Sequence, residues 1–291
     1  MKRFAPYLLV LPFVLIICFI FIGGLFQAVV QSLGYMPVFG FNEITFDFYR
    51  QVFNDWRFLN SIRNTFYIAF VSSLISVIMG TLIAIIMSKL IPAPKLSYLF
   101  YKTPILLPHL IVIVMMFFIF SQTGIISRFA FSLGLINNPN DFPLLVFDRL
   151  SIGIILVYLF KQIPFVSLTV FTVLKNIDKK HSQVAENLGS SSWHTLTKIT
   201  LPLLAPSIFS VFLICFAFGF GAFEVPFLLG SPATVTLPVL AYFEHRSPTL
   251  VTNLTGMVIN VIISVISLTL AFIYAIVFKV FNRHGLKGGL L

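Results

Sequence analysis

Residues 178–202 read DKKHSQVAENLGSSSWHTLTKITLP, a polar stretch with a central glycine that lies between two long hydrophobic runs. The chain around it, of 291 residues, is 58% hydrophobic and only 10% charged. A soluble domain carries roughly 25% charged residues, so the composition assigns the chain to the lipid bilayer. A polar segment of helix-forming composition between membrane spans predicts a contact with a partner outside the membrane.

Six nearly uncharged runs are long enough to cross ~30 Å of hydrocarbon as helices. The sequence therefore predicts an all-α membrane protein with six transmembrane helices. The first run exceeds the roughly 7–15 apolar residues of a signal peptide, so we expect it to be retained. Prolines predict a bent start of the third span, and Lys161-Gln162 with Pro164 predict an interruption in the fourth. The predicted spans are residues 6–26, 65–87, 98–122, 150–174, 203–229 and 254–278.

The segments between spans predict an orientation. With both termini in the cytoplasm, the inner segments hold twelve lysines and arginines against Asp178 and Glu186, and the outer segments are neutral. This asymmetry fits the positive-inside rule, so both termini are expected to be cytoplasmic, in a bacterial cell membrane. The net charge of +10 then encodes orientation and argues against nucleic acid as a partner.

The spans also predict a division into domains and short extracytoplasmic helices. Residues 1–62 are expected to form an N-terminal span with an extracytoplasmic segment. Residues 63–291 are expected to form a core domain of five spans that contains the polar segment, residues 178–202. Aromatic residues in 42–63 favour short helices at the membrane surface. Loops are expected at 125–149 and 230–249, the first with short helical or re-entrant parts.

The polar segment predicts two short helices. Asp178 can cap the first, because a short carboxylate accepts hydrogen bonds from the unpaired amides of a first turn. Gly189 can adopt positive φ and end it. Ser190 or Ser191 can cap a second helix that runs through Ile199 into the fifth span. An ordinary cytoplasmic loop is the alternative that these residues alone leave open.

The spacing within this segment resembles the EAA motif of permease subunits of type I ABC importers. Ala185 is followed after three residues by Gly189, and after nine more by Ile199-x-Leu201-Pro202. The resemblance covers the chain from about the second span to the end and implies the type I ABC importer permease fold, with this segment as the helix that couples to an ATPase. The residues to which it assigns this role are Gln183, Ala185, Glu186, Gly189, Ile199, Leu201 and Pro202.

The segment departs from the family pattern at one acidic position. Gln183 stands where the family has glutamate, so a salt bridge from that position is in doubt. Glu186 does not substitute for it, since a three-residue shift turns a side chain by about 300° around a helix.

The resemblance also implies partners. These are a dimeric cytoplasmic ABC ATPase that binds ATP and magnesium, a second permease subunit, an extracytoplasmic solute-binding protein and membrane lipid. A heterodimer of permeases is expected, with a homodimer as the alternative. The chain contains no G-x-x-x-x-G-K-[ST] phosphate-binding loop, so it is expected to be no enzyme, with no catalytic residue, metal site or cofactor of its own.

Two charged residues predicted to lie within spans are candidates for the solute path. Charges are costly inside a membrane and usually face a cavity or a partner. For Lys161 and Glu224, a mutual ion pair, a solute contact and snorkelling to the interface all remain open. Further polar or helix-breaking candidates on the path are Gln162, Pro226 and Asn260, although interhelical packing explains the amides equally well. His109 is as readily a packing residue as a contact.

The solute itself is less clearly indicated. The stretch GAFEVPFLLG around Glu224 is similar to the spermidine/putrescine branch of the family, which favours a small polar solute of the polyamine type. Ferric iron, thiamine and phosphonate are the alternatives within the family. Outside it, the alternative is a six-span secondary transporter driven by an ion gradient.

Overall fold

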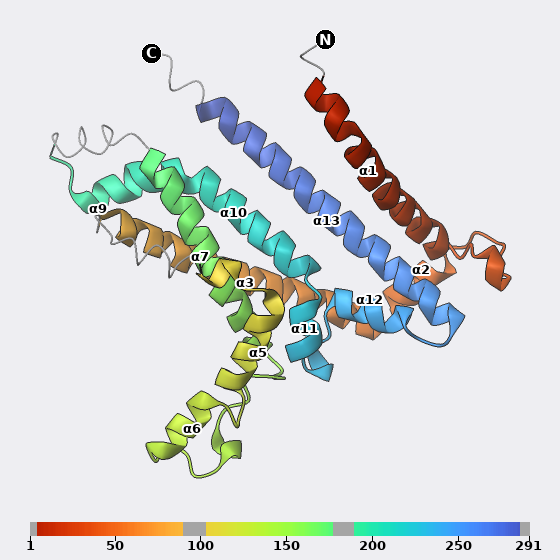
Figure 1. Ribbon diagram of the computed structural model, residues 1–291, viewed down its shortest axis with the longest axis horizontal. Helices are drawn as coiled ribbons and strands as arrows, with labels where there is room; N and C mark the ends of the chain where they lie inside the picture. Colours follow the sequence, from red (N-terminus) through yellow and green to blue (C-terminus); the bar gives the residue numbers. More distant parts are fainter. Residues whose placement is uncertain (1–4, 90–102, 177–188, 286–291) are drawn as a thin grey trace. The chain divides into compact units, whose positions relative to one another are not determined.

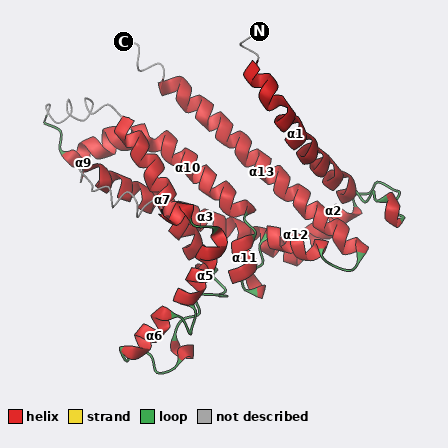
Figure 2. Ribbon diagram, viewed as in Figure 1, coloured by secondary structure: helices red, strands yellow, loops and turns green. Residues whose placement is uncertain are grey.

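The computed structural model describes residues 5–89, 103–176 and 189–285, and these residues are almost entirely helical (Figures 1 and 2). Extended pairing among them is limited to an isolated bridge between Met36 and Phe41. The prediction of six membrane helices is confirmed, whereas the orientation of the termini stays a prediction. The helices long and apolar enough to span a membrane are Leu9–Ser32, Trp56–Ser88, His109–Ser132, Ile152–Lys175, Ser192–Gly221 and Leu250–Lys279.

Short helices lie between the long ones, in the regions where the sequence predicts them and in one predicted loop. α2 lies in the predicted surface segment, α6 in the predicted broken segment and α12 in the second predicted loop (Figure 1). The α-helices are α1 (Ala5–Ser32), α2 (Asp47–Asn54), α3 (Trp56–Lys89), α5 (His109–Phe120), α6 (Ile125–Ser132), α7 (Ile152–Asn176), α9 (Ser192–Thr195), α10 (Leu201–Gly221), α11 (Glu224–Leu229), α12 (Leu237–His245) and α13 (Leu250–Gly285). The other helical turns are η1 (Pro37–Phe39), η2 (Pro139–Asp141), η4 (Pro232–Thr234) and a π-helical turn, η3 (Leu196–Thr200).

Two predicted spans differ from the observed helices. The fourth is not interrupted, because α7 runs as one helix through Pro164 and the polar side chains of Lys161 and Gln162 find hydrogen-bond partners on neighbouring segments. The fifth is interrupted instead. α10 ends at Gly221, Ala222 is extended, and α11 begins at Glu224.

The third predicted span is broken near its start, since residues 103–106 are helical and the chain leaves helical geometry at Leu107 and Pro108. Residues 98–102 of its predicted range lie outside the described residues. The backbone of Pro108 is extended (φ −56°, ψ 146°), and α5 begins at His109. Proline has no amide hydrogen to continue a helix, so the predicted bend becomes a full break before α5.

The described residues form two units, Met1–Ile62 with Leu237–Ile266, and Arg63–Thr236 with Ser267–Leu291. In the second unit, α7 packs against α5, α10 and α11. One core cluster centres on Tyr158 with residues of α3, α5 and α11, and the other joins α3, α7 and α10 around Val166. The predicted division at residue 62 stays a prediction.

Close approach of α3 to α7 depends on a glycine. A Cβ atom on Gly80 would lie 2.7 Å from the Cβ atom of Val166 and 3.0 Å from the carbonyl oxygen of Ile163. Such distances are shorter than van der Waals contact, so only glycine fits. Small residues at helix interfaces let backbones approach in membrane proteins, and this contact fixes how α7 and its polar residues are placed.

A buried aspartate sets the start of α7. The Asp148 carboxylate accepts hydrogen bonds from the amides of Leu150 (2.9 Å), Ile152 (2.9 Å) and Gly153 (3.3 Å). These contacts satisfy amides at the helix N-terminus that have no partner within the helix. Asp148 is 6% exposed, so its charge is stabilised by these amides and by the helix dipole.

Candidate functional site

The described part of the polar segment begins at Gly189, which has φ of +83°. The Ser191 hydroxyl accepts a hydrogen bond from the amide of His194 at 3.3 Å and so caps α9. The predictions of a positive φ at Gly189 and of a serine cap are therefore confirmed. Gln183, Ala185 and Glu186 lie outside the described residues, and their coupling role stays a prediction.

The helical path from α9 into α10 has no break. Thr195 and Thr200, which cap η3 and α10, both have α-helical backbone angles. Ile199 lies in the π-helical turn, and Leu201-Pro202 form the start of α10. Pro202 has no amide hydrogen to donate to the preceding turn, and the helix continues through this position after the π-helical turn. The polar segment is therefore joined to the span by continuous helix, as predicted.

An exposed aromatic side chain projects from this segment. Trp193 in α9 is 73% exposed, whereas Thr195 is buried. The Thr195 hydroxyl donates a hydrogen bond to Ser190 Oγ at 3.1 Å, which ties α9 back to the residue after Gly189. α9 is thus a short, capped helix with one buried side and one side that exposes a large aromatic ring.

Lys161 in α7 contacts the break before α5. Its ammonium group donates a hydrogen bond to the carbonyl oxygen of Leu107 at 2.7 Å and lies 3.4 Å from Nδ1 of His109. Because the chain leaves helical geometry at Pro108, the Leu107 carbonyl is outside the α5 hydrogen-bond pattern. Lys161 therefore satisfies a backbone acceptor that the proline break leaves unpaired.

The predicted alternative of a Lys161–Glu224 ion pair is not realised. The ion pairs in the described part of the chain join Arg57 to Asp55 and to Glu244. Glu224 is exposed at the start of α11, a helix that packs against α7 with Lys161 and against α5 with His109. The two opposite charges are thus neighbours without direct contact.

Gln162 is a packing residue in this structure. Its side chain accepts a hydrogen bond from Ser76 at 3.0 Å and donates one to the carbonyl of Cys215 at 3.4 Å. It is 5% exposed and bridges α3, α7 and α10. Of the remaining path candidates, Pro226 is buried in α11, and Asn260 is exposed on α13.

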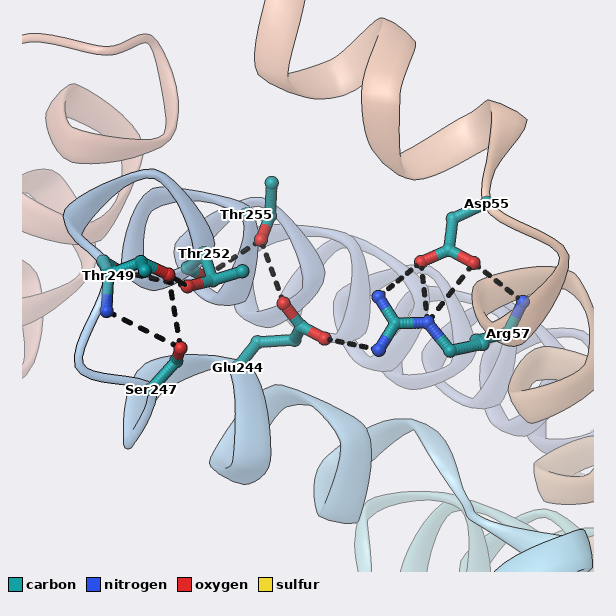
Figure 3. A network of polar contacts seen from close by, with 7 residues as sticks. All are labelled: Asp55, Arg57, Glu244, Ser247, Thr249, Thr252 and Thr255. Carbon is teal, nitrogen blue, oxygen red and sulfur yellow. Dashed lines mark hydrogen bonds and ion pairs between the residues drawn. The ribbon is translucent and has the colours of Figure 1, made fainter.

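A charged network in the first unit was not predicted (Figure 3). Arg57 pairs with Asp55 at 2.8 Å and with Glu244 at 3.2 Å, and Thr255 donates a hydrogen bond to Glu244 at 3.2 Å. Arg57 and Glu244 line a cavity of about 150 Å³ with Thr252 and Thr255. The sequence showed these charges, but no local signal pairs the start of α3 with the end of α12.

Residues that could hold a metal ion do not gather in the described ranges. No group of three or more histidine, cysteine, aspartate or glutamate residues occurs there in a suitable arrangement. The two cysteines, Cys18 and Cys215, are not joined to each other.

The sequence also matches a known protein family over most of its length. Residues 76–284 match the family of binding-protein-dependent transport system inner membrane components. The chain belongs to this family. It is therefore a multi-pass inner membrane protein and the permease subunit of an ABC importer, a subunit without catalytic activity. This membership decides against the predicted alternative of a secondary transporter driven by an ion gradient.

Individual relatives of this inner membrane component are distant. PhnU of Salmonella typhi, named as a 2-aminoethylphosphonate transport system permease protein, is 25% identical over 206 residues, covering 69% of this chain and 68% of PhnU. ThiP of Escherichia coli K12, a thiamine transport system permease protein, is 26% identical over 197 residues, covering 67% of this chain and 35% of ThiP.

A solved structure supports the fold. A chain of a bacterial ABC transporter involved in the import of the acidic polysaccharide alginate superposes with a TM-score of 0.73. The alignment covers 94% of this chain and 96% of that chain at 20% sequence identity. This likeness shows that the described helices adopt the fold of an ABC importer permease.

Proposed function

We propose that this permease couples to a cytoplasmic ABC ATPase dimer through residues 178–202. The observation that carries the proposal is the continuous helix from the Ser191 cap through η3 into α10. A force applied to α9 reaches the span without crossing a flexible loop. Closure of the ATPase on ATP would then move α10 and switch the path between inward-facing and outward-facing states.

We propose the surrounding parts of the importer from the family resemblance. The lysine-rich side of the membrane is the cytoplasmic side, and both termini lie there. An extracytoplasmic binding protein delivers the solute, a second permease subunit completes the path, and ATP and magnesium are bound by the ATPase. A heterodimer is favoured over a homodimer. The residues proposed to couple this segment to the ATPase are Gln183, Ala185, Glu186, Gly189, Ile199, Leu201 and Pro202.

Substitution at Gly189 tests the coupling. A Cβ atom there would meet nothing within 4 Å, so the effect of a side chain comes from the φ of +83° alone. Gly189→Val is strained in this conformation, whereas Gly189→Asn tolerates it, because asparagine adopts left-handed angles more readily than a β-branched residue. Gly189→Val is expected to insert normally but to lose ATP-driven uptake, and Gly189→Asn to retain most of it.

The matched control is Gly134→Val, at another glycine with positive φ (+71°) and open space around the Cβ position. It applies the same backbone strain outside the coupling segment and is expected to keep coupled uptake. If the reconstituted importer with Gly189→Val shows the same solute-stimulated ATP hydrolysis and the same uptake as the wild type, residues 178–202 do not dock the ATPase.

For the solute, we favour a small molecule of the phosphonate type over a polyamine. The relative PhnU is named for 2-aminoethylphosphonate, and no carboxylate neutralises Lys161 by direct contact among the described residues. The polyamine prediction rested on Glu224 and on similarity around it, and the relatives compared above add no support for it. Thiamine remains the second choice because ThiP matches two thirds of the chain.

Stimulation of the ATPase tests this choice. The importer, reconstituted in vesicles with its own binding protein, is expected to hydrolyse ATP faster with 2-aminoethylphosphonate than with spermidine or thiamine. Stimulation by spermidine alone would restore the polyamine prediction and refute the phosphonate proposal.

A further inference from the structure

We propose that Lys161, His109 and Glu224 form a two-pole solute site, in which Lys161 with His109 binds an oxyanion and Glu224 binds a cationic group of the same solute. The inference rests on the proposed function and names the residues that would recognise a phosphonate with an amine. It concerns the second unit alone, since all three residues lie within Arg63–Thr236.

The first argument is the cost of the exposed charges. Lys161 is half-buried, and Glu224 is exposed. A lysine or a carboxylate in contact with hydrocarbon at the centre of a span costs roughly 2.5–3.5 kcal/mol on insertion scales. The exposed parts of both side chains must therefore face water or a partner. Lys161 lies within the fourth span and Glu224 just beyond the end of the fifth at Gly221, on elements that pack against each other, so the inferred aqueous surface extends from the span to its end.

The second argument is the hydrogen-bonding capacity of the lysine. An ammonium group has three donors, and Lys161 directs one at the Leu107 carbonyl and a second toward His109. Among the described residues, no further acceptor takes the third donor, which is left for a ligand. The contact with the Leu107 carbonyl also fixes the ammonium group at the start of α5, where the helix dipole is positive and favours an anion.

The third argument is the position of His109. Its ring lies against Phe218 of α10, with 5.3 Å between ring centroids, and Phe218 in turn contacts Tyr158 at 6.2 Å. The imidazole is therefore held between α10 and Lys161. An imidazole held this way can donate a hydrogen bond to an oxyanion through the nitrogen that does not face Lys161.

The fourth argument is the separation of the opposite charges. Glu224 follows the break at Ala222-Phe223 and begins α11, which packs against both α5 and α7, the helices of His109 and Lys161, yet no ion pair joins it to Lys161 in the described residues. A direct pair would neutralise the site. Two separated poles instead match a zwitterion, whose two charges bind without cancelling the charges of the protein.

Charge-selective labelling tests the anionic pole without knowledge of the natural solute. His109→Cys is placed in a Cys18→Ser background, because Cys18 is exposed while Cys215 is buried. The full importer in nanodiscs is treated with sulfonatoethyl or trimethylammonioethyl methanethiosulfonate. Each labelling rate is divided by the rate of the same reagent with a free thiol. The ratio of the anionic to the cationic reagent is expected to exceed one. Lys161→Gln is expected to lower this ratio on the order of tenfold, the effect of one nearby charge in a partly aqueous site.

The control is Lys175→Gln, the same substitution at another lysine of α7, whose ammonium lies over the Phe171 ring. It is expected to leave the preference unchanged. A cysteine at position 109 that reacts with neither reagent would show that water does not reach the site and would overturn the proposal. An equal preference with lysine or glutamine at position 161 would overturn it too.

A lipid phosphate offers the same oxyanion chemistry, so the source of the ligand needs its own comparison. Methylphosphonate, held by the Lys161 that remains in His109→Cys, is expected to slow labelling at high concentration in nanodiscs of phosphatidylcholine alone and in those with phosphatidylglycerol. Slowing by phosphatidylglycerol but not by dissolved methylphosphonate would identify a headgroup site and overturn the solute site.

Uptake tests the cationic pole. Glu224→Gln is expected to lower uptake of 2-aminoethylphosphonate about tenfold and to leave methylphosphonate, which has no amine, almost unaffected, while Lys161→Gln lowers both. If Glu224→Gln lowers the uptake of 2-aminoethylphosphonate and of methylphosphonate equally, the two-pole arrangement is overturned. If the wild-type importer moves neither phosphonate, the proposed solute class fails, and the labelling preference still reports whether Lys161 forms an anion site.

Discussion

Removal of the Arg57 side chain is expected to destabilise the first unit more than removal of the Asp55 side chain, because Arg57 pairs with the buried Glu244 as well as with Asp55. Glu244 is 8% exposed, and its side chain is 10% exposed against 53% for Arg57. Arg57→Ala would leave a buried carboxylate whose remaining side-chain partner, within the part of the chain that the structure describes, is the Thr255 hydroxyl. Loss of one partner of a buried ion pair costs roughly 3–5 kcal/mol, whereas exposed pairs contribute roughly 0–1 kcal/mol.

Because Arg57 is half-exposed and Glu244 is buried, the expected cost of Arg57→Ala lies between these limits, at about 2 kcal/mol. Asp55 acts differently. It caps α3 by accepting a hydrogen bond from the Arg57 amide at 2.8 Å, and the loss of such a cap costs about 1 kcal/mol. Glu244→Gln removes the buried charge, so it should cancel much of the effect of Arg57→Ala, with a coupling of about 1 kcal/mol.

Denaturant unfolding in micelles measures these differences. The chain has two tryptophans, Trp56 and Trp193, so a Trp193→Phe background leaves Trp56, next to the network, as the only tryptophan reporter. The reasoning is refuted if Arg57→Ala costs no more than Asp55→Ala, or if Glu244→Gln and Arg57→Ala add without coupling.

Three further substitutions test the packing and the cap. Gly80→Ala should destabilise the second unit by roughly 1–3 kcal/mol through overlap with Val166, seen as a lower thermal midpoint; an unchanged midpoint would contradict the close approach. Gln162→Leu should cost about 1–3 kcal/mol by leaving the buried Ser76 hydroxyl unpaired, with partial recovery on adding Ser76→Ala; no recovery would argue against the bridge. Ser191→Ala should speed hydrogen exchange in the first turn of α9 several-fold, consistent with a cap worth about 1 kcal/mol, with equal exchange as the contrary result.

The features that sequence could predict are those whose signal is local. Six apolar runs predict six membrane helices, and Gly189 and Ser191 predict a positive φ and a helix cap because each residue type acts on its own backbone. The break before α5 was signalled in the same way by Pro108. These signals depend on neighbours within a few residues, which the sequence shows directly.

The features that sequence could not predict depend on partners far along the chain. Lys161 and Gln162 suggested an interruption of the fourth span, but contacts with Leu107, Ser76 and Cys215 satisfy both side chains within a continuous helix. Pro226 indicated a disturbance near the end of the fifth span, yet the break lies at Ala222, before it. A polar residue in a span has several acceptable partners, and only the packed structure selects one.

The π-helical turn at Leu196–Thr200 has a consequence for how this protein can change in evolution. A π-helical turn holds one residue more than an α-helical turn, and each residue in an α-helix rotates those that follow by about 100°. Because the wider turn absorbs its extra residue, loss of one residue there would restore regular α-helix and leave α9 on nearly the same side of α10. This turn is therefore a place where the length of the coupling segment can change by one residue while α9 and α10 keep their facing sides.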